Sequence, residues 1–277
     1  MKWLWTVLLL PYALCSFTSN KTEVLALAEL ASNAYHSPQS KDTWRNTTGV
    51  YNYLNSFGYK EDGLRAHLFS HNFKDTLVIS IKGTSLSSSN DKDNDNIMFS
   101  CCCGFPCKNS TCDRQQLTTS LPTLYVGLVL ETYRLVAEHY PGKEILFTGH
   151  SLGASIASIA GMQTCSKVVA FSSPPEALFT KRIGLKHNCQ GEHTRNIFHF
   201  GYEYDPIFKG TCGLLCKVAG YNMDSKCHHG NECIYSDVSK LGSTLITRHT
   251  INYLIDIIKN SEPPTCTFIH KCQESCS

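Results

Sequence analysis

Apolar and polar positions along this 277-residue chain form two patterns, one with helical spacing and one of short continuous apolar runs. In residues 23–35 the apolar side chains recur at helical spacing, which predicts an amphipathic helix with its inner face at Val24, Leu27, Ala28, Ala31 and Tyr35. Helices are also predicted over 123–139 and 250–259. Short apolar runs predict buried strands at 76–81, 145–148, 167–171 and 196–200. Strands that alternate with helices indicate an α/β domain with a largely parallel central sheet.

Two long stretches, residues 86–116 and 207–240, show little periodicity and are rich in cysteine. We expect both to be loop insertions into a single domain that spans residues 16–277. The chain has fifteen cysteines, and fourteen of them lie between Cys101 and Cys276. Cysteines in such polar, irregular sequence favour disulfides formed in an oxidising compartment. The spacing leaves their pairing open.

The N-terminus has the features of an export signal. A basic Lys2 precedes an apolar run, and small residues favour cleavage after Cys15, so residues 1–15 are predicted to be a signal peptide. The alternative is a short, uncleaved signal anchor. Three Asn-x-Ser/Thr sequons predict N-glycosylation at Asn20, Asn46 and Asn109. We therefore expect the protein in the secretory pathway, either secreted or in a vacuolar or endomembrane lumen.

Charge excludes one class of partner. The net charge is +2 and only 17% of the residues are charged, which is too weak a field to indicate nucleic-acid binding. The chain has no internal repeat and no coiled-coil heptads. We expect a monomer.

The chemistry is indicated by GHSLG, residues 149–153, which stands between a predicted strand and a predicted helix. A sharp strand-to-helix turn leaves no room for side chains at its flanks, so Gly149 and Gly153 suit the positions around an exposed Ser151. The helix N-terminus behind the serine stabilises developing negative charge. These features predict a nucleophile, and the alternative is a serine that only caps the helix.

A serine nucleophile needs a base and an acid that orients the base. In this type of fold the order is Ser, then Asp or Glu, then His. Asp205 follows a predicted strand and His249 precedes a predicted helix, so we select this pair. The other acids after Ser151 that we considered are Asp224 and Asp237, and the other bases are His228, His229 and His270. His150 is expected only to pack.

An oxyanion hole completes the predicted site. Its donors are the backbone N–H of Leu152 and the residue at the end of the first predicted strand, Thr84, through its backbone N–H or its hydroxyl. The alternative for Thr84 is an ordinary strand-end turn.

No metal or cofactor is expected. The run DKDNDN, residues 91–96, lacks the glycine and the glutamate that a calcium loop requires at its sixth and twelfth positions. The cysteines at 101–103 and the Cys227-His228-His229 run lack the ligand spacing of structural zinc sites. Acyl transfer by serine needs no cofactor.

The same residues resemble the fungal class 3 lipases, a family of α/β-hydrolase fold. The resemblance covers about residues 25–260 and is carried by Lys82-Gly83-Thr84, Gly149–Gly153, Phe171–Pro174, Asp205-Pro206-Ile207 and His249. The cysteine-rich stretches at 89–103, 204–212 and 226–235 are similar to the autophagy-related vacuolar lipase branch. That branch implies a membrane glycoprotein that degrades the phospholipid of autophagic bodies.

We therefore predict a serine lipase that hydrolyses phospholipid or triacylglycerol at a membrane or emulsion surface through an acyl-enzyme. Two alternatives are a secreted esterase of small, feruloyl-type esters and an inactive, cysteine-rich binding protein. The first insertion follows the oxyanion strand, where lipase lids occur. We hypothesise that it opens at an interface and contacts lipid through Ile97, Met98, Phe99, Phe105 and Pro106. The alternative is a disulfide knot that only braces the domain.

Overall fold

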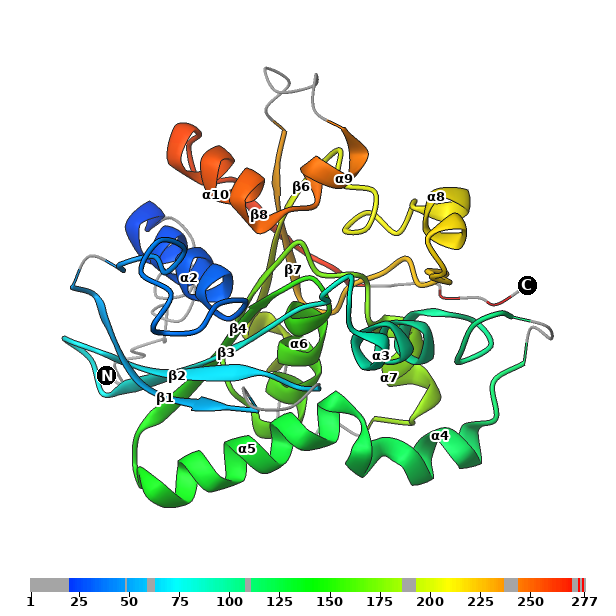
Figure 1. Ribbon diagram of the computed structural model, residues 1–277, viewed down its shortest axis with the longest axis horizontal. Helices are drawn as coiled ribbons and strands as arrows, with labels where there is room; N and C mark the ends of the chain where they lie inside the picture. The colour runs from blue at the N-terminus through cyan, green and yellow to red at the C-terminus, as the bar shows by residue number, and fades with distance from the viewer. Residues whose placement is uncertain are drawn as a thin grey trace, which may run out of the picture.

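A mixed eight-stranded sheet organises the computed structural model (Figure 1), which describes residues 20–47, 49–58, 63–107, 111–185, 193–236, 244–270, 274 and 276. The strands lie in chain order: β1 (Tyr51–Phe57), β2 (Ala66–His71), β3 (Thr76–Ile81), β4 (Glu144–His150), β5 (Val168–Phe171), β6 (Ile197–Tyr202), β7 (Asn231–Tyr235) and β8 (Cys266–Phe268). Neighbours from β3 to β7 are parallel, and the outer pairs are antiparallel. The predicted α/β class with a largely parallel central sheet is confirmed.

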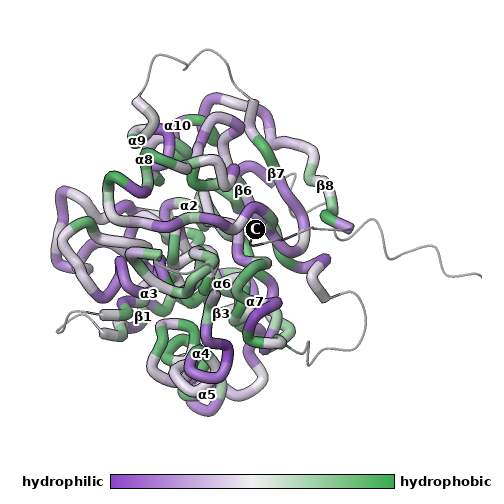
Figure 2. Tube along the Cα trace, turned by 90° about the vertical axis from the view of Figure 1, so that its right-hand side faces the viewer, coloured by the Kyte–Doolittle hydropathy of each residue, from purple (hydrophilic) through white to green (hydrophobic). Residues whose placement is uncertain are grey.

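Helices cover both faces of this sheet (Figure 1). On one face lie α2 (Lys21–Asn33) and α10 (Ile251–Asn260), which contact each other. On the other face lie α5 (Tyr125–His139) and α6 (Leu152–Thr164). The remaining helices are α3 (Ser89–Phe99), α4 (Arg114–Ser120), α7 (Ala177–Arg182), α8 (Gly213–Val218) and α9 (Leu245–Arg248), with short 3-10 turns η1 (Leu121–Thr123) and η2 (His193–Asn196). Figure 2 shows α4 as largely hydrophilic, and Leu117 is its buried residue.

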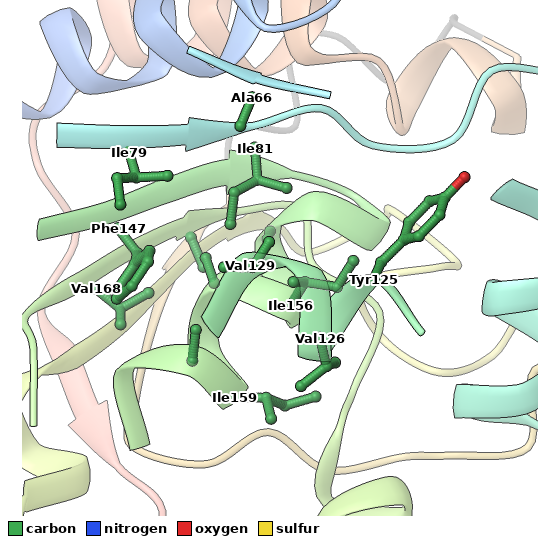
Figure 3. Packing of buried hydrophobic residues seen from close by; sticks show 14 of the residues in the cluster. Ala66, Ile79, Ile81, Tyr125, Val126, Val129, Phe147, Ile156, Ile159 and Val168 are labelled. Carbon is green, nitrogen blue, oxygen red and sulfur yellow. The ribbon is translucent and has the colours of Figure 1, made fainter. Parts of the chain in front are cut away.

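Two hydrophobic clusters hold the layers together because side chains alternate along each strand. In β3, Leu77 and Ile79 face the α5 and α6 side, while Val78 between them faces α2 and α10. Figure 3 shows Ile79 and Phe147 packed on the first side, among side chains of α5 and α6. Each such fully buried side chain contributes about 1.5–3 kcal/mol through removal from water. The two-sided burial explains why these strands are almost uniformly apolar.

The first insertion is not the loop that was expected. Residues 89–99 form helix α3, whose first turn is capped by Ser88 accepting from the N–H of Asp91 at 3.1 Å. Its acidic and amide side chains are largely buried against the domain, so polar contacts replace the apolar periodicity that normally reveals a helix. Met98 and Phe99 are also buried, at 0% and 1% exposure. Neither side chain reaches the surface in this structure, so the hypothesis that the insertion opens at an interface and contacts lipid through them stays a prediction.

The second insertion is also more regular than predicted. Residues 207–240 include α8 and the sheet strand β7, and the tail after Pro263 adds β8 to the sheet edge. The missed strand β7 is short and begins with two polar residues, Asn231 and Glu232, so it lacks a clear apolar run.

Disulfides are present, as predicted. Those between described residues are Cys101–Cys276, Cys102–Cys107, Cys103–Cys112, Cys212–Cys216 and Cys233–Cys266. Cys165 and Cys227 are disulfide-bonded as well. The covalent links tie the insertions and the C-terminal tail to the domain.

Other expectations stay predictions. The proposed signal peptide and the sequon at Asn109 lie outside the described residues. Asn20 and Asn46 are exposed, and Asn20 also caps α2 by accepting from the N–H of Glu23 at 3.2 Å. In the described part of the chain, no helix has the length and apolar character needed to cross a membrane.

Candidate active site

The turn from β4 to α6 holds Ser151 in a backbone conformation that side chains rarely adopt, with φ 55° and ψ −131°. Such strain persists only where the surroundings impose it, and it is concentrated at functional sites. A Cβ on Gly149 would lie 2.7 Å from the carbonyl carbon of Gly153, and one on Gly153 would lie 2.3 Å from the oxygen of Ile81. Both positions therefore require glycine, and the turn points Ser151 out of the sheet edge.

Ser151, His249 and Asp205 form one hydrogen-bonded row. The His249 Nε2 atom lies 2.9 Å from Ser151 Oγ, and His249 Nδ1 lies 2.9 Å from Asp205 Oδ2. Because the Asp205 carboxylate accepts from Nδ1–H, the neutral imidazole keeps a lone pair on Nε2 for the serine proton. The Asp205 side chain is fully buried, and that of His249 is 14% exposed.

Local structure holds both partners of Ser151. Asp205 follows β6, and its Oδ1 also accepts from the backbone N–H groups of Ile207 at 2.9 Å and Phe208 at 3.3 Å. His249 lies between α9 and α10, where Thr250 caps α10 by accepting from the N–H of Tyr253. The His249 imidazole therefore lies just before the first turn of α10, and the buried face of α10 packs on the sheet.

The other candidates considered for acid and base lie elsewhere. Asp224 accepts from the N–H of Cys101 at 2.8 Å, and Asp237 is outside the described residues. His229 pairs with the Thr180 hydroxyl at 2.7 Å, and His270 is exposed beside the Phe268 ring. His228 belongs to a separate buried cluster with Glu176 and His199.

The oxyanion loop packs tightly against the serine turn. A Cβ on Gly83 would lie 2.3 Å from the carbonyl oxygen of His150 and 3.1 Å from Ser151 Cβ. Thr84 follows this glycine and lines the same pocket as Ser151 and His249. Leu152 is the first residue of α6, where backbone N–H groups lack helical acceptors.

Asp95 on α3 contacts Thr84, a partner that sequence reasoning missed. The Thr84 Oγ1 and Asp95 Oδ2 atoms are 2.5 Å apart. Burial raises the pKa of Asp95 from 3.8 to about 7, and repulsion from Asp91 adds to the rise although the Thr84 bond opposes it. The sequence does carry a signal for this contact, the helical spacing of Asp91, Asp95 and Phe99. A comparison with calcium loops does not detect that spacing.

A second unanticipated contact involves His150, which was expected only to pack. Its Nε2 lies 2.8 Å from the carbonyl oxygen of His249, and its Nδ1 lies 2.8 Å from the Tyr35 hydroxyl. Burial, and then the neighbouring His249, lowers the pKa of His150 to about 3, so the ring is neutral. Since a carbonyl can only accept, Nε2–H donates to His249 and Tyr35 donates to Nδ1. This chain of bonds fixes the backbone of His249.

The row opens into a largely apolar cavity of about 390 Å³. This volume lies within the range of small-molecule sites. Its lining includes Thr84, Ser151 and His249 from the row and its oxyanion loop, with apolar walls from Leu86, Ile207, Tyr221, Met223, Ile246 and Ile251.

Known proteins with similar sequences are described as lipases. Residues 78–181 match the family described as "Lipase (class 3)". The chain is 34% identical over 283 residues to "Putative lipase ATG15" of Passalora fulva and 34% identical over 288 residues to "Putative lipase atg15" of Penicillium rubens. These matches cover 90% and 92% of this chain, and the chain spans 43% of the length of each relative.

Solved structures of fungal lipases are similar at lower identity. A lipase from Rhizopus microsporus var. chinensis matches 78% of this chain and 75% of its own, with 15% identity and a TM-score of 0.44. The Lip2 lipase of Yarrowia lipolytica matches 81% of this chain and 79% of its own, with 17% identity and a TM-score of 0.45. The α/β-hydrolase fold expected from the sequence is confirmed by the sheet itself, whose neighbours from β3 to β7 are parallel and which places Ser151 between β4 and α6. Residues 78–181 of the chain thus match the class 3 lipase family, and over most of its length the chain is similar to the fungal ATG15 proteins.

Proposed function

We propose that this protein is a serine lipase that hydrolyses carboxylic esters of lipids through an acyl-enzyme. The observation that carries the proposal is the row from Ser151 through His249 to Asp205, which opens into an apolar cavity. A helix-capping serine would need neither a base at 2.9 Å nor a strained backbone. The similarity to class 3 lipases supports the same reaction.

In the proposed acylation, Ser151 Oγ attacks the ester carbonyl while His249 Nε2 takes its proton. Asp205 stabilises the imidazolium and keeps Nδ1–H pointed at its carboxylate. The carbonyl oxygen becomes an oxyanion, which the N–H of Leu152 and the donors of Thr84 stabilise. His249 then protonates the departing alcohol, and the acyl group stays on Ser151.

Deacylation repeats these steps with water. His249 removes a proton from water as the water attacks the acyl-enzyme, the oxyanion forms in the same place, and Ser151 leaves with the proton. The products are a fatty acid and the free enzyme. His150 and Tyr35 act as positioning residues because their bonds hold the His249 backbone.

The surface around the cavity supports a lipid substrate rather than a small, soluble ester. Leu86 and Ile246 line the cavity and are 91% and 70% exposed. Helix α8 adds Leu214 and Val218, which are 78% and 81% exposed, and its Cys216 also lines the cavity. Figures 1 and 2 both place α8 and α9 at the same end of the molecule. Exposed apolar side chains gathered at a site entrance favour contact with a lipid surface.

The reaction is tested by fatty-acid release from phospholipid vesicles, triacylglycerol emulsion and short-chain esters. Ser151→Ala is expected to abolish release, and Asp205→Asn to reduce kcat by roughly 10³–10⁴-fold while the protein stays folded. Labelling of Ser151 by a fluorophosphonate separates an enzyme from an inactive binding protein. Activity confined to short, soluble esters would favour the esterase alternative, and no labelling would end the proposal.

We propose the lumen of the secretory pathway as its location. The five disulfides between described residues support an oxidising compartment. Breakdown of membrane lipid in a vacuole is the more specific proposal. Fluorescence of the tagged full chain, compared with a vacuolar and a secreted marker, distinguishes the two destinations.

A further inference from the structure

A second cluster of reactive side chains lies outside the proposed active site. Glu176 precedes α7, His199 lies on β6, and His228 lies just before β7. Their exposed fractions are 0%, 0% and 2%. Each offers one ligand atom, and these atoms all lie within 4.8 Å of one another. None of the three lines the lipid cavity.

Two atoms in this cluster are buried without a hydrogen bond to any described residue: Glu176 Oε2 and His199 Nε2. The His199 ring is oriented by Ser173, whose hydroxyl lies 2.7 Å from its Nδ1. Its Nε2 faces Glu176 Oε1 at 3.5 Å, too far for a good hydrogen bond. Two atoms bound at about 2.0–2.1 Å to one tetrahedral zinc ion lie about 3.3 Å apart. The observed separation thus suits a shared metal ion.

His228 is held by two oxygens that can assist a metal. Its Nδ1 lies 2.9 Å from Glu232 Oε1, and its Nε2 lies 2.9 Å from the carbonyl oxygen of Ser173. Both oxygens are acceptors, so both ring nitrogens carry hydrogen, and metal binding through either nitrogen releases its proton to solvent. The bond at the other nitrogen then orients the ring, as metal-bound histidines usually require. The oxygen that loses its bond to His228, from either Glu232 or Ser173, then lies beside the ion and can act as its fourth ligand. Movements on the order of 1 Å close the remaining distances.

The unpartnered atoms of the cluster also favour a cation. Glu176 Oε1 accepts from the Ser158 hydroxyl at 2.7 Å and from the N–H of His229 at 3.1 Å. A carboxylate oxygen and an imidazole nitrogen that are both buried without a partner among the described residues are costly in a protein interior, and one shared cation would satisfy both.

We propose that Glu176, His199 and His228 bind a Zn²⁺ ion. Two imidazoles and a carboxylate suit zinc, whereas calcium and magnesium prefer all-oxygen shells. The site lies outside the cysteines weighed from the sequence, since Cys227 is disulfide-bonded. This proposal departs from the sequence expectation of no metal, because the ligands come from three separate segments and have no spacing to recognise.

The ion would brace the support of Asp205. The His228 ring stacks on Phe208 with centroids 4.7 Å apart. Phe208 donates its N–H to Asp205 Oδ1. Zinc would therefore join the segments after β5 and before β7 to the loop that carries the acid. Its role is structural, and loss of the ion is expected to lower stability more than it alters the chemistry.

The test uses the full chain, expressed through a secretory host so that disulfides form, and purified without a histidine tag. After dialysis, elemental analysis is expected to find about one zinc per chain. A chelator should lower Tm by several degrees, and Zn²⁺ but not Ca²⁺ or Mg²⁺ should restore it. X-ray absorption at the zinc edge should show only nitrogen and oxygen at about 2.0–2.1 Å.

Glu176→Gln and His199→Gln should each lose zinc and the zinc-dependent part of Tm. His71→Gln is the matched control and should keep zinc. His71 is a buried histidine 3.7 Å from the Glu23 carboxylate, and among the residues that the structure describes no third metal-binding side chain completes a group there. A purified protein that contains no zinc, and whose Tm does not respond to added Zn²⁺, overturns the proposal. The three side chains would then be held by contacts within the protein alone. Sulfur in the zinc shell, or zinc retained by both cluster variants, places the metal elsewhere and overturns it equally.

Discussion

At the scale of single residues, the protonation of Asp95 decides what Thr84 can do. A protonated Asp95 donates to Thr84 Oγ1 and leaves the threonine hydrogen free for the substrate oxyanion. An ionised Asp95 takes that hydrogen, so only backbone donors remain. The charged or titratable groups that act on Asp95 are Asp91, which raises its pKa, and His249 and Lys82, which lower it.

Asp95→Asn is predicted to keep the favourable arrangement at every pH, because an amide N–H can replace the acid proton. With the pKa of Asp95 at about 7, roughly one tenth of the wild type stays protonated at pH 8. The ratio of variant to wild-type kcat should therefore rise by up to about tenfold from pH 6 to pH 8. A flat ratio contradicts the prediction.

The same variant should change the pH dependence of stability. Because the pKa of Asp95 is raised on folding, the folded state binds its proton more tightly than the unfolded chain. The contribution is present below about pH 4 and is lost as pH rises to about 7, at up to about 1.4 kcal/mol per pH unit. Urea unfolding across this window measures the slope, which should be smaller in Asp95→Asn.

At the scale of elements, helix α3 of the first insertion holds the site in place and presents little apolar surface in this structure. Helix α3 buries Met98 and Phe99 and holds the oxyanion loop through polar contacts, such as the 2.6 Å pair between Lys82 and Asp91. Around the cavity entrance, the exposed apolar side chains belong to the loop before α3, to α8 and to α9. An interface with lipid is therefore assigned to short elements around the cavity entrance.

Charges at this entrance are predicted to impair lipid hydrolysis selectively. The double variant Leu86→Asp and Ile246→Asp should reduce fatty-acid release from vesicles by about tenfold or more, since two apolar anchors are lost. Hydrolysis of a short, soluble ester should fall much less. Phe73→Asp is the control, because Phe73 is 82% exposed before the start of β3, at the other end of the strand from Thr84. Equal losses on both substrates would contradict the assignment.

At the scale of the whole molecule, disulfides join segments that are far apart in the sequence. Cys101–Cys276 spans 175 residues and connects the chain after α3 to the C-terminal tail, whereas Cys212–Cys216 spans four residues around α8. Cross-links that close long loops remove more freedom from the unfolded chain. The stability of the domain is therefore expected to rest more on the long-range link.

Replacing Cys101 and Cys276 by serine is predicted to lower the free energy of unfolding by about 2–5 kcal/mol. Replacing Cys212 and Cys216 should cost about 2 kcal/mol or less, because the closed loop is short. Denaturant unfolding of both double variants gives the comparison. A larger loss from the short link would show that local packing, and not chain entropy, dominates.

Local pattern alone determined the strands β3 to β6, the helices α2, α5 and α10, and the strained turn at Ser151. These features depend on neighbours within a few residues, such as glycines that admit a close approach, so the sequence carries them directly. Asp205 and His249 were also found, because each borders a recognisable strand or helix.

Only the tertiary structure decided which polar residues are buried and what they contact. Asp95 reaches Thr84, His150 reaches His249, and Glu176 meets His199 and His228, although nothing in their local sequence indicates these partners. Helix α3 and strand β7 were missed because long-range polar contacts and sheet pairing stabilise them, and apolar periodicity does not. The physical reason is that desolvation and partner choice depend on the assembled fold, while secondary structure is encoded over a few neighbouring residues.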